Sequence, residues 1–177
     1  MLRTIARRFK IMRTISALCT SAENHALADG QRQPGAEHFL LAAFDLPDGT
    51  AQRIFEHFHR GAEDTRKAIA LQYEVALQGI GIDTEVSSTL LRPPENIRQS
   101  SRLYKAQPSG QAVLEGLVQL KKEDGDQPLL GRHVLLVISR MQQGVAARAL
   151  RTMGIDSAQL EKEAQGEIRR REYATSP

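Results

Sequence analysis

Apolar residues recur along this chain at spacings of three and four positions, which is the pattern of one buried face on an α-helix. In the first long segment these residues are Ile15, Leu18, Cys19, Ala22 and Ala26. Glycine and proline between positions 29 and 35 end this pattern. No segment shows the strong alternation of apolar and polar residues that predicts a half-buried strand. The pattern therefore predicts an all-α protein.

Three further helices complete the first half of the chain. The second is short and apolar, and a turn at positions 45–49 separates it from the third, for which Thr50 is the expected N-cap. Gly61 is expected to end the third helix. The apolar faces of the three helices are predicted to contain Leu40, Leu41 and Phe44, then Ile54 and Phe58, then Ile69, Tyr73 and Ala76.

The second half of the chain repeats this plan. When the sequence is shifted by 95 positions, His38 aligns with His133, Leu40 with Leu135 and Gly49 with Gly144, without a gap. Apolar character is kept at position after position, which indicates an internal duplication. The helices of the second copy are predicted around Val113, Leu114 and Leu117, around Val134, Leu135 and Ile138, over 146–153, and around Leu160, Ala164 and Ile168. Asp156 and Gln159 form a capping-box pattern before the last helix.

The duplication predicts one domain of eight helices in two pseudo-symmetric four-helix repeats. We expect a basic extension at 1–10, a double-repeat domain at 11–170 and a tail at 171–177. Repeat 1 covers about 11–78, a glycine- and proline-containing linker covers 79–109, and repeat 2 covers about 110–170. Because a four-helix unit this small buries little apolar area, the two repeats are expected to pack together.

Composition narrows the function classes only modestly. The net charge is +3, with 24 basic residues interleaved with 21 acidic ones, which does not by itself favour nucleic acid as a partner. No apolar run approaches the ~20 residues that a membrane span requires, so we expect no membrane partner. Cys19 is the only cysteine, which excludes an internal disulfide. A cytoplasmic location is the expectation.

The first fourteen residues contain five basic residues and no acidic one, with Ile5, Phe9 and Met12 at helical spacing. Amphipathic, arginine-rich segments of this kind are found in organelle-targeting presequences, which would place the protein in an organelle. The favoured interpretation is the basic beginning of the first helix, because apolar spacing continues through Ile15, Cys19 and Ala22.

Two short motifs resemble the N-terminal domain of the Clp (Hsp100) unfoldases. Repeat 1 contains Glu37-His38-Phe39-Leu40-Leu41 followed by Gly49-Thr50-Ala51, and repeat 2 contains Arg132-His133-Val134-Leu135-Leu136 followed by Gly144-Val145-Ala146. The resemblance covers about residues 11–170 and is nearest to the ClpC type. It implies a helical domain that docks substrates and adaptor proteins for an ATPase ring. The sequence has no Gly-Lys pair, and hence no phosphate-binding P-loop of its own.

The resemblance also suggests two partner-binding residues. In some ClpC-type domains the glutamate of each motif accepts the guanidinium side of phosphoarginine, and Glu37 occupies that position in repeat 1. A carboxylate suits this ligand because it forms a bidentate, charge-assisted pair with a guanidinium group. Arg132 occupies the position in repeat 2 and would repel the same ligand, so two equivalent phosphoarginine sites are not expected. Ala106-Gln107 stands where the family commonly has Phe-Thr. Arg132 is a candidate for contact with a carboxylate or phosphate of a partner.

Each candidate also has a structural interpretation. Glu37 is an acidic residue in the first turn of a helix, where the helix dipole favours it. His38 and His133 are expected to hold helix starts by hydrogen bonds rather than to bind metal, and Cys19 is expected to act as a small buried hydrophobe. His57 and His59 are two positions apart and cannot chelate together on a helix. Residues 169–171 are three arginines, expected at a solvated helix end.

The leading hypothesis is therefore a non-enzymatic binding module that assists or regulates Clp-dependent proteolysis, without a cofactor or metal. Its expected partners are Clp unfoldase or protease components, adaptors and substrate peptides. A helical nucleic-acid-binding protein that uses the basic first segment is the alternative. An enzyme ranks lowest, because no nucleophile–base set, paired-carboxylate motif or metal-spaced cluster is evident.

Overall fold

The computed structural model describes residues 2–79, 104–123 and 128–174, with side chains described from residue 11 to 167 within these ranges. The described residues form eight helices and no strand, which confirms the predicted all-α fold. The first repeat contains α1 (Leu2–Ala28), α2 (Ala36–Asp45), α3 (Thr50–Glu56) and α4 (Ala62–Gly79). The second contains α6 (Pro108–Glu123), α7 (Gly131–Ser139), α8 (Val145–Thr152) and α9 (Ser157–Ala174). Most of the predicted linker lies outside the described residues.

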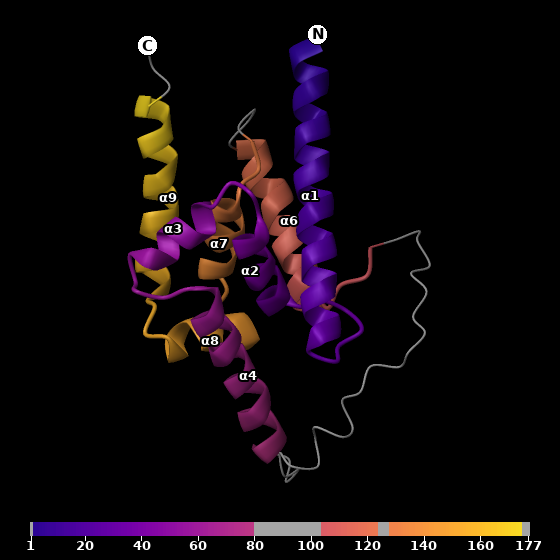
Figure 1. The fold of residues 1–177 in the computed structure, drawn as a ribbon, viewed down its shortest axis with the longest axis vertical. Helices are drawn as coiled ribbons and strands as arrows, with labels where there is room; N and C mark the ends of the chain where they lie inside the picture. Colours follow the sequence, from indigo (N-terminus) through magenta and orange to yellow (C-terminus); the bar gives the residue numbers. More distant parts are fainter. Residues whose placement is uncertain (1, 80–103, 124–127, 175–177) are drawn as a thin grey trace.

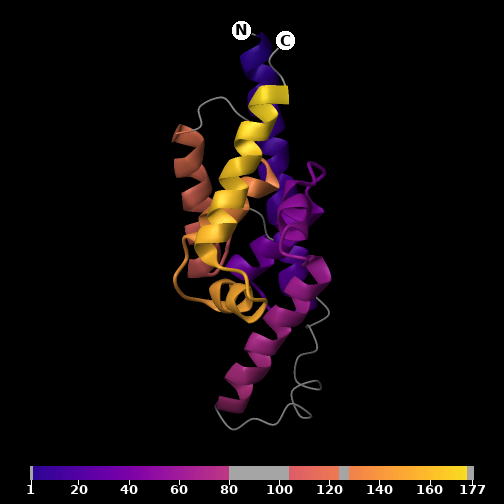
Figure 2. The ribbon, with the colours of Figure 1, turned by 90° about the vertical axis from the view of Figure 1, so that its left-hand side faces the viewer.

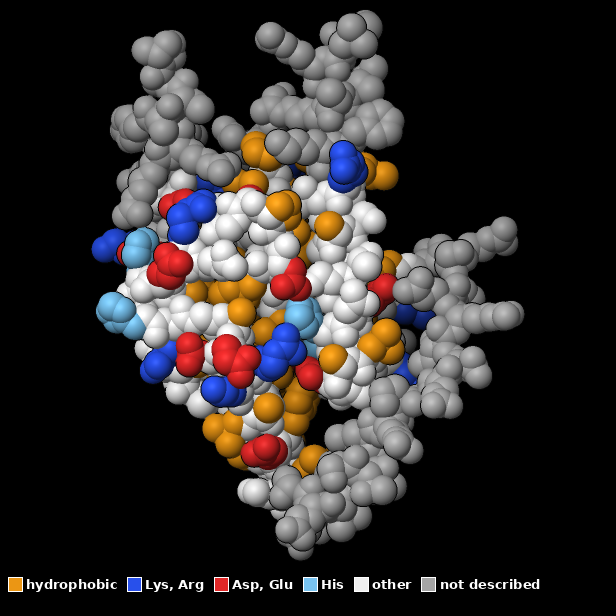
Figure 3. Space-filling model, in the orientation of Figure 1, with side chains coloured by type: hydrophobic (Ala, Val, Ile, Leu, Met, Phe, Trp, Pro, Cys, Tyr) orange, Lys and Arg blue, Asp and Glu red, His pale blue; other side chains and the backbone are white. Residues whose placement is uncertain are grey.

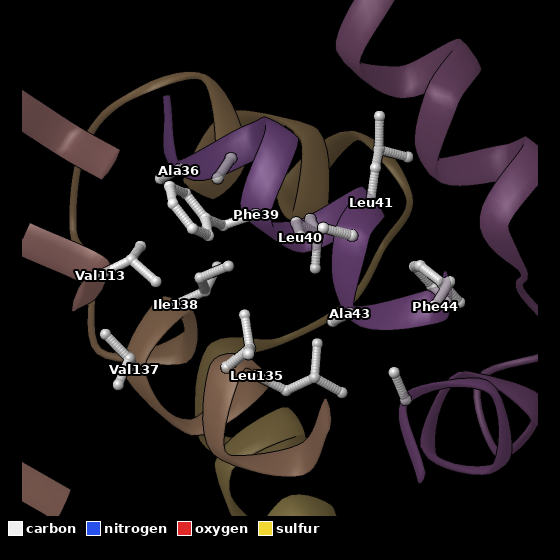
Figure 4. Close-up of a cluster of buried hydrophobic side chains, with 14 of the residues drawn as sticks. Ala36, Phe39, Leu40, Leu41, Ala43, Phe44, Val113, Leu135, Val137 and Ile138 are labelled. Carbon is white, nitrogen blue, oxygen red and sulfur yellow. The ribbon is translucent and has the colours of Figure 1, made fainter. Parts of the chain in front are cut away.

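The two short apolar helices, α2 and α7, pack against each other at the centre of the molecule (Figure 1). Figure 4 shows Phe39, Leu40 and Ala43 of α2 facing Leu135 and Ile138 of α7. Every residue of α7 and all but the last residue of α2 are buried. Beyond the polar residues of their first turns, these helices are mostly apolar because neighbouring helices cover every face.

The outer helices join the repeats by crossing between them. Helix α4 of repeat 1 packs on α8 of repeat 2, and α9 of repeat 2 packs on both α7 and α3. Gln72 of α4 donates a hydrogen bond to Thr152 Oγ1 of α8 at 2.9 Å, and Arg53 of α3 pairs with Glu167 of α9 at 3.0 Å. The repeats therefore share one core, as their small size predicts.

Three local expectations are wrong. The N-cap of α3 is Gly49 rather than Thr50, because the Thr50 hydroxyl is used by α7 and the Thr50 N–H donates to Asp48. Gly61 does not end α3 but precedes α4, where its carbonyl accepts the Thr65 N–H, and His59 provides the left-handed turn at φ 53° instead. Ala76 is exposed, because α4 extends past the helices that cover its first turns (Figure 1).

The expectation that Asp156 caps the last helix is confirmed. Asp156 Oδ1 accepts the N–H groups of Ala158 and Gln159 at 3.0 Å and so caps α9. Glycines stand at the equivalent positions 49 and 144 with φ of 63° and 99°, a conformation that favours glycine, at the start of α3 and α8. The arginines at 169–171 lie on α9, outside the residues whose side chains are described.

Candidate functional site

Glu37 lies in the first turn of α2, and its carboxylate is buried, with 3% of the residue exposed. The Tyr73 hydroxyl of α4 donates a hydrogen bond to Glu37 Oε1 at 2.7 Å. A Cβ atom at Gly35 would collide with this same carboxylate, so the backbone at Gly35 lies directly against it. The acidic group is therefore enclosed by its own fold and has a donor already in place.

The surroundings of Tyr73 keep its hydroxyl protonated, so that it can donate a hydrogen bond. Burial raises the pKa of its hydroxyl well above the usual range, and the adjacent negative charge of Glu37 and the hydrogen bond to it raise the pKa further. A neutral phenol donates to a carboxylate, whereas a phenolate would repel it. Tyr73 therefore stays protonated at neutral pH and can donate to Glu37.

His38 has the role that the sequence predicts. Its Nδ1 accepts the backbone N–H of Gly35 at 2.8 Å, and in repeat 2 His133 Nδ1 accepts the N–H of Leu130 at 2.9 Å. Each imidazole thus closes the first turn of its helix from the N3 position, as the Glu or Gln of a capping box does. Asp29 Oδ2 lies 3.3 Å from His38 Nε2. Among the described residues, no three His, Cys, Asp or Glu side chains cluster in a way that could hold a metal ion.

Gln107 holds the loop that leads into α2, a role that sequence reasoning missed. Its backbone N–H donates to Pro34 O at 3.0 Å, and its side-chain amide donates to Gln33 O at 3.0 Å and to Gln31 Oε1. The preceding Ala106 is buried. Residues 106–107 therefore fix the position of Gly35 and, through it, the enclosure of Glu37.

Arg132 lies in the first turn of α7, equivalent to Glu37, and is also buried, with 2% exposed. The loop before α3 covers this helix start: Asp48 Oδ2 accepts the Gly131 N–H at 3.0 Å, and Thr50 Oγ1 accepts the Arg132 N–H at 2.9 Å. The negative charge of the Asp48 carboxylate is also stabilised by the positive end of the helix dipole at the N-terminus of α7. The two candidate residues thus share a place in the pseudo-symmetry but have different surroundings.

Among the hollows on the part of the surface that the structure describes, two lie between helices. One, of about 260 Å³, lies between α6 and α7 and is lined by Ala112, Gly116, Leu120, Val137 and Met141 together with Gln119 and Arg140. The other, of about 220 Å³, lies where α4 meets α8, and Leu71, Ala68 and Met153 contribute to its lining. Leu71 and Val75 stand one turn apart on α4 and are 43% and 57% exposed. Together these features offer apolar contact area at the surface.

Cys19 is half-buried in α1, and burial raises the pKa of its thiol. A raised pKa lowers the thiolate fraction that nucleophilic or redox chemistry requires. The residue therefore has the character of a small hydrophobe, as its sequence position predicts.

No protein-family model matches the sequence, and no curated protein sequence does. Among solved structures, the chain is similar to the N-terminal domain of the caseinolytic-protease-associated chaperone ClpD from Arabidopsis thaliana. The TM-score is 0.55 at 16% sequence identity, and the similarity covers 90% of this chain and 92% of that one. The chain therefore has the fold of a Clp N-terminal domain over nearly its whole length. The assignment to the ClpC type rests on the sequence motifs alone.

Proposed function

We propose that this protein is a non-enzymatic docking module that acts as an accessory or regulator of Clp-dependent proteolysis. The observation that carries the proposal is the fold, which is similar to a Clp-associated chaperone's N-terminal domain over 90% of the chain. The absence of a Gly-Lys pair supports a role in binding rather than in nucleotide hydrolysis. The partners proposed are Clp unfoldase or protease components, adaptors and substrate peptides, in the cytoplasm.

The hollow between α4 and α8 is the proposed place for an apolar peptide side chain. Leu71 and Val75 continue its apolar surface along α4, while Arg60, Asp64 and Lys67 add polar groups of both signs. Apolar anchors surrounded by polar groups are typical of peptide-docking surfaces. On the face seen in Figure 3, the acidic and basic side chains of the described residues are interspersed.

Glu37 is proposed as a guanidinium-binding residue only in an opened form of the site. An incoming guanidinium must displace the Tyr73 hydroxyl, because Tyr73 donates to the same carboxylate. A Tyr73→Phe variant, which has lost this donor, is therefore expected to bind phosphoarginine more tightly than the native protein. Contact of Arg132 with a carboxylate or phosphate of a partner is also a prediction. Because the Arg132 side chain is buried, this contact too would require an opened form of the site.

The test is an affinity pull-down of the tagged full-length protein from its native cells, read by mass spectrometry. Clp ring or peptidase subunits are expected in the eluate. The double variant Leu71→Ser/Val75→Ser is expected to lose them, whereas Val118→Ser, which changes an exposed apolar residue outside both hollows, is expected to keep them. A Glu37→Ala variant tests the carboxylate in parallel. An eluate free of Clp components would contradict the proposed function.

A further inference from the structure

The second half of α4 extends past the other described helices at one end of the molecule (Figures 1 and 2). The helix packs on α2 and α8, and its buried residues all precede position 73. Leu71 and Val75 are 43% and 57% exposed. None of the described helices, α4 included, is long and apolar enough to cross a membrane. Helix α4 therefore presents apolar side chains that the rest of the domain leaves uncovered.

Helical register groups these side chains on one face of α4. At about 3.6 residues per turn, seven positions lie within about 60° of Leu71 around the helix axis. We call them the outer face of α4, and they are Asp64, Lys67, Ala68, Leu71, Glu74, Val75 and Gln78. Six of the seven are exposed, and Ala68 is buried but lines the hollow between α4 and α8. Ala68 and Val75 form the edge of this face nearer α8, and Lys67 and Glu74 form the opposite edge.

The charges of the outer face are complementary to a second copy of the same face. In a twofold-symmetric antiparallel helix pair, equivalent edges meet, and residues equally far before and after the axis lie opposite each other. With the axis at Leu71, Lys67 of one copy lies within one position of Glu74 of the other. Asp64 lies opposite Gln78, whose amide can donate to a carboxylate. No like charges on this face lie opposite one another.

The apolar edge of the outer face is complementary in the same register. Ala68 of one copy lies within one position of Val75 of the other, at the hollow that Thr152 and Met153 of α8 also line. This hollow has a volume of about 220 Å³, and an apolar cavity of about 150 Å³ is enough to admit benzene. A second copy therefore supplies a branched apolar side chain where the hollow can accept one.

Lys67 is available for the contact with a second copy. Its Nζ lies 3.7 Å from Glu63 Oε1 on the preceding turn, and the two side chains are 74% and 70% exposed. Because an exposed ion pair of this kind contributes little to stability, turning Lys67 towards Glu74 of a second copy costs little. An unrelated apolar peptide would cover Leu71 and Val75 but would not require opposite charges at equal distances from Leu71. The charge pattern therefore favours a second copy of this chain as the partner.

We propose that this protein forms a twofold-symmetric dimer through antiparallel pairing of the outer faces of α4. Leu71 lies at the axis, Val75 of each copy fills the hollow of the other, and Lys67 pairs with Glu74 across the outer edge. The dimer does not depend on the docking function proposed above, although it covers the same hollow. One consequence does rest on that function: peptide docking and self-association compete, so that only the monomer binds a peptide.

The test is sedimentation equilibrium of the purified full-length protein, with no other protein present. A face of this size is expected to give a weak dimer, so the average mass should rise from that of the monomer towards that of the dimer as concentration increases to about 1 mM. Leu71→Ser/Val75→Ser is expected to remain monomeric. Val118→Ser, which changes an exposed apolar residue of α6, is the matched control and should dimerise like the native protein. Circular dichroism should show both variants folded, because the substituted residues are exposed.

Charge reversal tests the register of the pair. Lys67→Glu and Glu74→Lys should each raise the dimer dissociation constant about tenfold, because each replaces two symmetry-related attractive pairs by repulsive ones. The double variant Lys67→Glu/Glu74→Lys should recover the native dissociation constant to within about threefold, since it restores opposite charges across the interface.

Cysteine cross-linking locates the axis. In a Cys19→Ala background, which removes the native cysteine, Leu71→Cys is expected to form an interchain disulfide under mild oxidation. Glu63→Cys in the same background is expected to form none. At about 1.5 Å per residue, the two copies of position 63 lie about 24 Å apart along an antiparallel pair centred on position 71.

Several results would overturn the proposal. They are a protein that stays monomeric at about 1 mM, a dimer that persists in Leu71→Ser/Val75→Ser, and a double charge variant that does not recover. Disulfide formation by Glu63→Cys instead of Leu71→Cys would contradict the antiparallel arrangement. A monomeric protein that still captures Clp subunits would overturn the dimer and leave the proposed function intact, whereas a dimer that captures none would do the reverse.

Discussion

Single residues determine whether the side chains of the candidate binding residues are accessible to a ligand. Glu37 occupies the position that the family resemblance marks for ligand binding, but Tyr73, thirty-six positions later in the chain, covers it with a direct hydrogen bond. The 3.6-residue periodicity predicted that Tyr73 faces inward, yet nothing in the sequence linked its hydroxyl to Glu37. That link depends on the angle at which α4 crosses α2, which only tertiary packing sets.

The tyrosines predict how stability depends on alkaline pH. Burial and neighbouring negative charge raise the pKa values of Tyr73 and Tyr104 above their usual range in the folded protein. Above about pH 10 the unfolded chain releases these protons first, so the free energy of unfolding should fall as pH rises further. Urea unfolding between pH 8 and 11.5 measures the fall. The Tyr73→Phe/Tyr104→Phe variant should show a shallower slope, and an unchanged slope would exclude these tyrosines as its cause.

The helix-start histidines provide a second residue-scale prediction. His133→Ala leaves the buried N–H of Leu130 without its acceptor and should lower the free energy of unfolding by about 1–3 kcal/mol. His133→Gln should recover part of the loss, because glutamine at N3 can accept the same N–H. Urea denaturation of both variants checks the prediction. Equal destabilisation by alanine and glutamine would mean that imidazole packing, rather than the hydrogen bond, is what matters.

At the scale of elements, close approach between helices depends on glycines whose importance the sequence does not reveal. A Cβ at Gly116 would lie 2.6 Å from Val137 Cγ1, and one at Gly110 would collide with the Pro34 carbonyl. Helix α6 can therefore approach both α7 and the loop before α2. The sequence alone shows only that these glycines lie inside a predicted helix, where glycine lowers helix propensity.

Two glycine substitutions separate packing from propensity. Gly110→Ala should destabilise the protein by about 1–3 kcal/mol, because the backbone carbonyl of Pro34 cannot move aside cheaply. Gly166→Ala in α9, where an added Cβ meets nothing within 4 Å, should be stabilising by up to about 1 kcal/mol through helix propensity. Chemical denaturation of both variants provides the comparison. Similar effects of the same sign would refute the packing argument.

At the scale of the whole molecule, the repeats are joined by elements that cross between them. Helix α4 packs on α8, and Ala68 and Ile69 of α4 are buried. Asp48 and Thr50, at the start of α3, accept backbone N–H groups at the start of α7. If either repeat were separated from the other, the helix faces that now contact the other repeat would be exposed to solvent. We therefore expect the duplication seen in the sequence to produce one cooperative unit rather than two independent domains.

The full chain should accordingly unfold in a single transition that far-UV circular dichroism and tyrosine fluorescence report at the same urea concentration. Residues 1–79 expressed alone should lose most of their helical signal, because the faces of α2 and α4 that the second repeat covers would be exposed. Circular dichroism and amide NMR dispersion of the half-chain test this. A half-chain with dispersed amide signals would show that the first repeat folds independently.

The sequence by itself determined the helical class, the eight helices of the described residues, the duplication and the two histidine-capped helix starts, because these depend on periodicity and on contacts within a few residues. Tertiary structure decided which side chains meet across the repeats: Tyr73 on Glu37, Gln107 on the loop before α2, and Thr50 on the backbone of Arg132. It also decided that Met12 lies outside the core, because the face of α1 that packs is set by where α2 lies. Local pattern fixes which faces are apolar, and only the arrangement of helices fixes which of them are covered.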